Sequence, residues 1–223
     1  MSLLNDAVKI QAQQILNKLP NPVKILVFTQ EMECQFCREN RQLAEELAGL
    51  SDKVTLSVHD FQQDKEMVEK YRIERVPALV VEGEKDYGIR FYGIPAGYEF
   101  TTLLNALQIA GRRDSGLKPE TREKLKTITS PVKIEVFVTL TCPYCPMMAG
   151  LAHRFAMENE NITATAIDAQ EFPVLANYYQ VSAVPKTVIN GLHQIEGALP
   201  EERLLAELLK VAGAPQGSAL CRV

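Results

Sequence analysis

The residues best suited to chemistry are two Cys-x-x-Cys pairs, Cys34–Cys37 and Cys142–Cys145. Two cysteines at this spacing can close into a small disulfide that is readily reduced again, above all at the start of a helix. A helix N-terminus stabilises a thiolate through its free N–H groups and the positive end of its dipole. We therefore expect the first cysteine of each pair to attack and the second to resolve the mixed disulfide. The fifth cysteine, Cys221, is expected to be an exposed thiol near the C-terminus.

The surroundings of the two pairs repeat along the chain. A Val-Pro dipeptide follows each pair at the same distance, since Pro77 stands 43 residues after Cys34 and Pro185 stands 43 residues after Cys142. Internal similarity of this kind indicates a duplicated structural unit. Dithiol–disulfide exchange by a duplicated domain is therefore the leading interpretation.

An apolar, β-branched run precedes each pair, PVKILVF at 22–28 and PVKIEVF at 131–137. Such runs are typical of strands buried on both faces of a sheet. Each copy then predicts the order helix, strand, cysteine-bearing helix, strand, helix, strand, strand, helix. The predicted helices are 3–18, 34–49, 64–71, 98–110, 119–128, 142–158, 170–179 and 200–212, and the predicted strands are 23–29, 53–59, 78–82, 87–92, 132–138, 162–167, 186–190 and 193–196.

Each copy predicts a small α/β unit. Strand–helix–strand alternation gives a parallel pair of strands, and the last two strands, joined by a brief turn, give an antiparallel pair. The expected architecture is a four-stranded mixed sheet flanked by helices, made twice in tandem. We expect the first unit at 1–112, the second at 117–214 and a tail at 215–223, with the glycines of the segment 111–116 forming the joint.

Charge and hydropathy argue against several classes of partner. The net charge is −4, and neither half has the basic surplus that nucleic acid or anionic lipid favours. No apolar run reaches the roughly 18 residues that span a bilayer. The first 19 residues mix charged and amide side chains with apolar ones, unlike a signal peptide. We therefore expect a cytoplasmic protein with no nucleic-acid or membrane partner.

Zinc binding is the structural alternative for the cysteines. Cytosolic thiols are normally kept reduced, so paired cysteines there are more often catalytic or metal-binding than structural. Two Cys-x-x-Cys pairs could supply the four thiolates of a zinc site. Here the pairs stand 105 residues apart, each inside its own copy and each at a predicted helix start, not in a Gly-rich turn. We expect redox-active cysteines and no bound metal.

The charges around the two pairs differ. Glu31 and Glu33 precede Cys34, and their negative charges are expected to raise its thiol pKa, while Arg38 opposes them. Cys142 has no charged residue within six positions on either side. We therefore expect Cys142 to be the more reactive nucleophile and the C-terminal pair to dominate the chemistry.

The second pair, Cys-Pro-Tyr-Cys with a downstream Val-Pro, resembles the motif of glutaredoxins and thioredoxins. Residues 1–212, with one pair in each half, resemble the protein disulfide oxidoreductases of thermophilic bacteria and archaea. The resemblance implies a thioredoxin fold in each half, with a cis proline facing each disulfide. Val76–Pro77 and Val184–Pro185 match that position. We expect both peptide bonds to be cis, with the Val backbone groups presented to an extended substrate strand.

The resemblance also implies a buried carboxylate before the cysteines that accepts a proton, as in thioredoxins. Glu135, seven residues before Cys142, is the candidate, although its counterpart in the first unit is Leu26. The alternative is that Glu135 lies at a sheet edge and extends its head group into solvent. The sequence favours neither interpretation over the other.

Three functions follow from these features and resemblances. The first is a protein dithiol–disulfide oxidoreductase that reduces, forms or isomerises protein disulfides. It would receive electrons from a thioredoxin-reductase-like flavoenzyme and need no cofactor of its own. The second is an electron-transfer module between such a flavoenzyme and a peroxiredoxin. It resembles the N-terminal part of bacterial alkyl hydroperoxide reductase flavoproteins, in which one of two copies has lost its cysteines. The presence of both pairs here favours the first function, and a zinc-binding structural module is the third.

Overall fold

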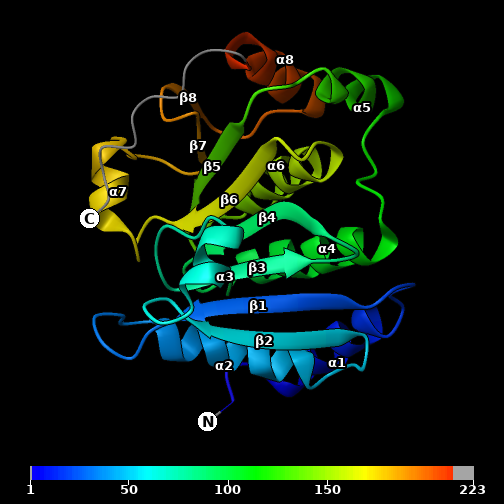
Figure 1. Ribbon diagram of the computed structural model, residues 1–223, viewed down its shortest axis with the longest axis vertical. Coiled ribbons are helices and arrows are strands. Elements are labelled where there is room, and N and C mark those ends of the chain that lie inside the picture. The colour runs from blue at the N-terminus through cyan, green and yellow to red at the C-terminus, as the bar shows by residue number, and fades with distance from the viewer. Residues whose placement is uncertain (1, 213–223) are drawn as a thin grey trace.

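The computed structural model describes residues 2–212, and the predicted order of elements is present in both halves (Figure 1). The first half contains α1 (Asp6–Leu16), β1 (Val23–Thr29), α2 (Cys37–Ala48), β2 (Val54–Asp60), α3 (Lys65–Lys70), β3 (Ala78–Glu82), β4 (Asp86–Tyr92) and α4 (Glu99–Arg112). The second half contains α5 (Pro119–Lys126), β5 (Val132–Val138), α6 (Cys145–Glu158), β6 (Ile162–Asp168), α7 (Pro173–Tyr178), β7 (Lys186–Ile189), β8 (His193–Glu196) and α8 (Glu201–Val211). The predicted tail at 215–223 and Cys221 lie outside the described residues.

Each half holds the predicted four-stranded mixed sheet. In the first half, β1 pairs in parallel with β2 and antiparallel with β3, which pairs antiparallel with β4. In the second half, β5 pairs in parallel with β6 and antiparallel with β7, which pairs antiparallel with β8. The expected architecture of two mixed sheets is therefore confirmed. The limits of the two units, 1–112 and 117–214, remain our proposal, and α4 runs through residue 112 at their border.

The two sheets are joined into one, which the sequence did not predict. β4 pairs in parallel with β6, and the eight strands follow the order β2-β1-β3-β4-β6-β5-β7-β8. Two antiparallel steps lead from β1 to β4 and two parallel steps lead from β4 to β5, so β1 and β5 run in the same direction. The carboxyl ends of β1 and β5 therefore lie on the same side of the sheet (Figure 1). The two cysteine pairs directly follow these strand ends in the sequence.

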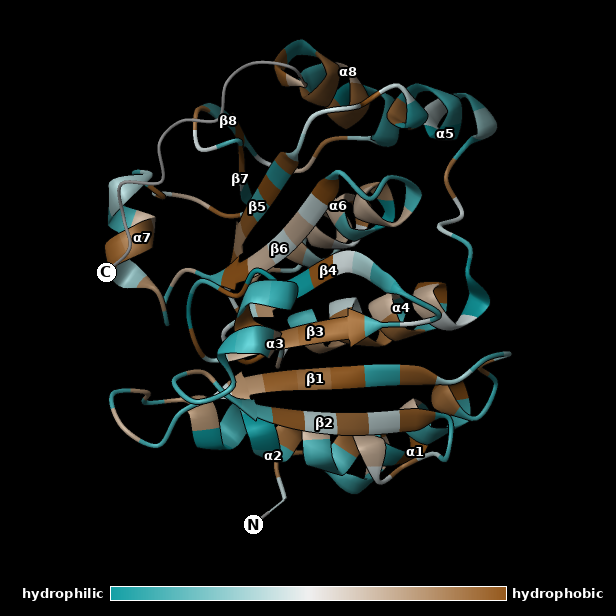
Figure 2. Ribbon diagram, viewed as in Figure 1, coloured by the Kyte–Doolittle hydropathy of each residue, from teal (hydrophilic) through white to brown (hydrophobic). Residues whose placement is uncertain are grey.

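Helices cover both faces of the sheet. On one face, α1, α2, α4, α5, α6 and α8 contribute to a single large apolar core. The other face carries a smaller core around Phe28, Tyr71 and Phe137, covered by α3 and α7. β1 and β3 are hydrophobic along most of their length (Figure 2), as expected for strands buried on both faces. No helix among residues 2–212 is long and apolar enough to span a bilayer.

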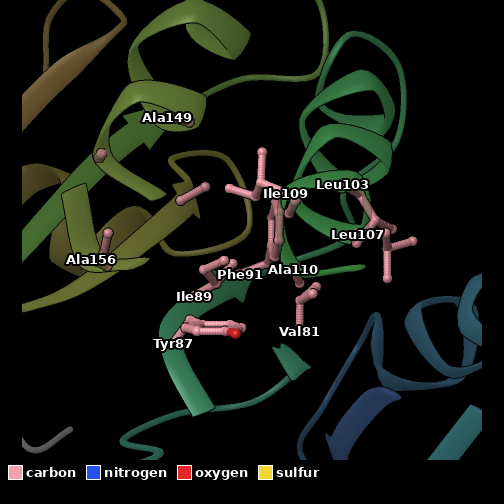
Figure 3. Close-up of a cluster of buried hydrophobic side chains, with 14 of the residues drawn as sticks. Val81, Tyr87, Ile89, Phe91, Leu103, Leu107, Ile109, Ala110, Ala149 and Ala156 are labelled. Carbon is pink, nitrogen blue, oxygen red and sulfur yellow. The ribbon is translucent and has the colours of Figure 1, made fainter. Parts of the chain in front are cut away.

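The large core is shared between the two units. Leu103 and Leu107 of α4 lie near Phe91 of β4, with Ala149 and Ala156 of α6 on the other side of the cluster (Figure 3). Alanine has no atoms beyond Cβ, so α6 can approach α4 and β4 closely and still exclude water. Together with the β4–β6 ladder, this core fixes the positions of the two cysteine pairs relative to each other.

Candidate active site

Both cysteine pairs are closed disulfides at the start of a helix, with the two Cα atoms 5.5 Å apart in each. The helices begin at Cys37 and Cys145, the second cysteine of each pair, whereas the sequence predicted that they begin at Cys34 and Cys142. The first cysteine instead lies in the turn between strand and helix. The backbone N–H groups of the first helical turn have no partner within the helix, so they are available to the sulfur of this first cysteine.

The turn gives Cys142 a hydrogen bond suited to a thiolate. The backbone N–H of Cys145 donates to Sγ of Cys142 at 3.1 Å. In the reduced protein, negative charge on this sulfur would be stabilised by the N–H donor and by the positive end of the α6 dipole. Pro146 occupies the first turn of α6, where its missing N–H removes no helical hydrogen bond.

The second cysteine of each pair is more deeply buried than the first. Cys37 is 3% exposed and Cys145 is 0% exposed, whereas Cys142 is 8% exposed and Cys34 is partly exposed. A protein substrate can therefore reach the sulfur of Cys34 or Cys142 first. The buried sulfur is placed to complete the exchange from inside the protein.

The two Val-Pro loops contain the cis peptide bonds of the described chain. The Val76–Pro77 and Val184–Pro185 bonds are both cis. In the second unit, Sγ of Cys142 lies 3.7 Å from the carbonyl oxygen of Val184, so the loop and the disulfide form one surface. The strands β3 and β7 begin directly after the two prolines.

Buried carboxylates lie where the two units meet. Glu99 opens α4 and Asp168 ends β6, and both line a small cavity with Leu140, two residues before Cys142. Glu99 is 2% exposed, and neither of its carboxylate oxygens has a hydrogen-bond partner among the described residues. Burial raises the pKa of Glu99 to about 7; the nearby Thr102 hydroxyl offsets part of this effect and the charge of Asp168 adds to it. Such a carboxyl group can accept a proton near neutral pH.

Glu171 belongs to the same acidic group. The backbone N–H of Ile94 donates to its Oε1 at 2.8 Å, and a Cβ atom on Gly93 would lie 3.1 Å from that oxygen. Burial raises the pKa of Glu171 to about 7 and that of Asp168 above its usual range. Full ionisation of all three carboxyl groups is therefore costly at this junction. Between residues 2 and 212, no group of three or more His, Cys, Asp or Glu side chains is arranged to hold a metal ion.

Glu135 does not lie where a proton acceptor for the disulfide would lie. Its neighbours Ile134 and Val136 point into the core that contains both cysteines of the second pair, so Glu135 points to the opposite face of β5. There Nζ of Lys133 pairs with Oε1 of Glu135 at 3.0 Å. Because β5 is a central strand and Glu135 is 3% exposed, the residue is not at a sheet edge either. Neither interpretation offered by the sequence describes its position.

The buried polar residues of both sites were not predicted from the sequence. Glu99 is part of the first unit but lines a cavity together with Val138 and Leu140 of the second, and the junction of the two sheets brings it there. Asn40, three residues after Cys37, is fully buried without a side-chain partner among the described residues. The available signal was a polar residue on an otherwise apolar helix face, at the position where the second copy has Met148.

Known proteins share this architecture. The model of the Thioredoxin domain family matches residues 23–105 and 132–210. The structure of a protein disulfide oxidoreductase from Aeropyrum pernix K1 is similar, with a TM-score of 0.89, 30% sequence identity and 97% of each chain covered. The alkylhydroperoxide reductase protein AhpF from Enterococcus faecalis (V583) is also similar, with a TM-score of 0.84 and 28% identity over 92% of this chain and 99% of that chain.

A longer protein is similar in sequence along part of its length. The corresponding alkyl hydroperoxide reductase protein of Pseudomonas aeruginosa is 29% identical over 218 residues, which are 98% of this chain. The present chain spans only 40% of that protein's length. The likeness therefore concerns one part of the longer protein.

Proposed function

The chain belongs to the thioredoxin-domain family, and we propose that it is a protein thiol–disulfide oxidoreductase with two redox-active disulfides. The observation that carries this proposal is the matched pair of sites. Each unit holds a closed Cys-x-x-Cys disulfide at a helix start. Both disulfides follow strands whose carboxyl ends lie on the same side of one sheet. The end-to-end likeness to a protein disulfide oxidoreductase supports it.

The proposed reaction passes through a mixed disulfide. The thiolate of reduced Cys142 attacks one sulfur of a substrate disulfide, and the other substrate sulfur leaves and takes up a proton. Cys145 then loses its proton and attacks Sγ of Cys142, which releases the second substrate thiolate and closes the Cys142–Cys145 disulfide. The substrate gains two electrons, which the protein loses. The protons released when Cys142 and Cys145 become thiolates go to solvent, and the two substrate sulfurs take up two protons, the second after its release as a thiolate. The same steps in reverse form a disulfide in a dithiol substrate, and Cys34 and Cys37 are proposed to act in the same way.

We propose Glu99, in place of Glu135, as the proton acceptor for the second site. Its support is an unpaired, buried carboxylate with a pKa of about 7 in the cavity that Leu140 lines. Glu99→Gln is expected to slow the release of substrate from Cys142 at neutral pH and to leave the first attack unchanged. Glu135→Gln, on the opposite face of the sheet, is the matched control and is expected to change neither step.

Substrates are proposed to be extended segments of proteins. The carbonyl oxygen of Val184 lies beside Sγ of Cys142, and a backbone acceptor at this place can bind the main chain of a substrate next to its disulfide. Val76 and Pro77 are proposed to play the same part at the first site. Recognition through the main chain tolerates many substrate sequences, which suits a general oxidoreductase.

A second candidate function is electron transfer to a peroxiredoxin. The observation that favours it is the likeness to AhpF and to part of the longer alkyl hydroperoxide reductase protein. In both functions we propose that electrons come from a thioredoxin-reductase-like flavoenzyme in the cytoplasm, and that the chain itself needs no cofactor. Peroxide consumption by a peroxiredoxin and such a flavoenzyme, measured with and without this protein, separates the second function from the first.

The test of the proposal is insulin reduction by dithiothreitol with cysteine variants. Cys142→Ser/Cys145→Ser is expected to lose most of the activity, and Cys34→Ser/Cys37→Ser is expected to lose less. The variant with all four serines is expected to be inactive, and activity in that variant would overturn the mechanism. Metal analysis of the reduced protein tests the zinc alternative, for which we expect no stoichiometric zinc.

A further inference from the structure

A polar side chain lies in the apolar core behind the N-terminal disulfide. Asn40 is 0% exposed, and neither its Oδ1 nor its Nδ2 has a hydrogen-bond partner among the described residues. Leu43, Ala44 and Leu47 of the same helix are buried with it. Burying an amide without a partner is unfavourable. Its position is explained if a partner becomes available in another redox state of the protein.

The neighbouring group that changes with redox state is the sulfur of Cys37. Asn40 follows Cys37 by three residues in α2, and residues at this spacing are neighbours on a helix, with Cβ atoms about 5–6 Å apart. Helical side chains tilt toward the N-terminus, so the amide of Asn40 points back toward the turn that holds Cys37. Reduction turns this sulfur from one half of a disulfide into a thiol or thiolate, which accepts a hydrogen bond.

The second unit lacks this donor. Met148 follows Cys145 by three residues, as Asn40 follows Cys37. Met148 is also 0% exposed, and it packs in the apolar core with Cys145. A thioether cannot donate a hydrogen bond. Of the two buried cysteines, only Cys37 therefore has an amide donor three residues further along its helix.

We propose that Asn40 is a positioning residue that donates a hydrogen bond to the Cys37 sulfur when the N-terminal pair is reduced, and thereby raises the reduction potential of this pair. The proposal rests on the proposed function, in which the pair is reduced and reoxidised. The donor stabilises only the reduced product, so it shifts the equilibrium toward the dithiol, as stabilisation of a reduced form does in strongly oxidising disulfides.

Exchange with glutathione measures this equilibrium. Two molecules of reduced glutathione supply two electrons and become one molecule of oxidised glutathione, while the S–S bond between Cys34 and Cys37 breaks and both sulfurs take up a proton. The N-terminal pair is measured in the chain that carries Cys142→Ser and Cys145→Ser. After equilibration with defined mixtures of reduced and oxidised glutathione, free thiols are alkylated and counted by mass spectrometry. The C-terminal pair is measured in the converse double variant.

A reciprocal exchange of residues tests the role of the amide. Asn40→Met is expected to shift the N-terminal equilibrium about tenfold toward the disulfide, which corresponds to a potential lower by about 30 mV. Met148→Asn is expected to shift the C-terminal equilibrium toward the dithiol by a similar factor. Leu47→Met alters the same core of α2 far from Cys37 and is expected to leave the equilibrium unchanged.

The outcomes separate this inference from the proposed function. If Asn40→Met changes the melting temperature but leaves the equilibrium constant within twofold, the amide serves packing alone and the inference is overturned, while the proposed function stands. If the N-terminal pair exchanges with glutathione in no variant, the proposed function of that pair fails together with the inference. Should Met148→Asn not fold, Asn40→Met and Asn40→Leu, which remove a polar group from the core, decide the matter.

Discussion

The backbone N–H of Tyr98 in the first unit donates a 2.9 Å hydrogen bond to the carbonyl oxygen of Leu140 in the second. Because Leu140 stands two residues before Cys142, this bond ties the entry of α4 to the turn that holds Cys142. Gly97 makes the approach possible, since its φ is +56° and a Cβ atom there would overlap the Leu140 carbonyl oxygen. The first unit thus helps to hold the disulfide of the second.

Gly97→Ala is expected to destabilise the protein and to impair the second site. The new methyl group forces the Leu140 carbonyl away and strains a left-handed backbone, for a loss of about 2 kcal/mol in the free energy of unfolding. Insulin reduction by Cys142 and Cys145 is expected to slow, while the N-terminal pair keeps its equilibrium with glutathione. Urea unfolding and the two redox assays measure these effects.

Gly150→Ala is the matched control for this prediction. Gly150 lies inside α6, and a Cβ atom there meets nothing within 4 Å. Alanine favours helix over glycine, so this variant is expected to be more stable by about 0.5–1 kcal/mol with unchanged activity. Equal unfolding curves for Gly97→Ala and the unaltered protein would contradict the role assigned to the Leu140 contact.

The thiol of Cys142 is expected to titrate at a lower pH than that of Cys34. The Cys145 N–H donor stabilises the Cys142 thiolate, and no acidic residue lies within six positions of Cys142 in the sequence. Glu31 and Glu33, in contrast, repel a negative charge on the Cys34 sulfur. The rate of iodoacetamide alkylation against pH, measured for each reduced pair in the chain that lacks the other, gives both pKa values. A lower value at Cys34 would refute the proposed dominance of the second site.

Local patterns predicted the units of this fold but not the contacts between them. The duplicated Val-Pro spacing and the apolar runs before the cysteines predicted two mixed sheets, because strand and helix periodicity are properties of each unit alone. The β4–β6 ladder was not predictable in this way, since it joins strand edges of different copies. For the same reason the sequence did not identify Glu99, a residue of one unit that lines a cavity with Leu140 of the other, two residues before Cys142.

The prediction for Glu135 failed for a different physical reason. Sequence distance from Cys142 suggested a carboxylate near the disulfide, but side chains on a strand alternate between the two faces of the sheet. Val136, one position further, points toward α6, so Glu135 must point away from it. A shift of one residue therefore decides between a catalytic position and a structural one.

Glu99→Gln is expected to stabilise the protein above pH 7. The pKa of Glu99 rises from its ordinary value of 4.5 to about 7 on folding, so between these two pH values the folded chain holds a proton that the unfolded chain has released. Stability contributed by this group is complete below pH 4.5, falls as the pH rises to about 7, and is lost above it. The shift corresponds to about 3 kcal/mol, which the uncharged variant retains at pH 8. Urea unfolding at pH 4 and pH 8 measures the difference.

Glu123→Gln is the control for the pH series. The side chain of Glu123 is 72% exposed and pairs with Lys126 on the surface, so its replacement is expected to change stability by less than about 0.5 kcal/mol at either pH. Parallel pH profiles for Glu99→Gln and the unaltered protein would show that Glu99 is ionised at no cost. That result would also remove the support for its role as a proton acceptor.

Lys133 and Glu135 form a polar cluster on the face of β5 away from the disulfide. Nζ of Lys133 lies 3.0 Å from Oε1 of Glu135 and 2.6 Å from Oε2 of Glu74. Burial alone would lower the pKa of Lys133, but the two carboxylates outweigh it and raise the pKa above its usual range. The first unit has Leu26 at the position of Glu135, fully buried, so an apolar side chain fits this place in the fold.

Glu135→Leu is therefore expected to destabilise the protein by about 2 kcal/mol, because it leaves the Lys133 ammonium with one carboxylate fewer in a largely buried setting. The double variant Lys133→Met/Glu135→Leu removes both charges, and we expect it to recover most of that loss, since no unpaired buried charge remains. Both variants are expected to reduce insulin at the unaltered rate, because the cluster lies across the sheet from the cysteines. Urea unfolding and insulin turnover measure the two effects. If the double variant remains folded in the assay but reduces insulin more slowly than the unaltered protein, Glu135 becomes a catalytic candidate again.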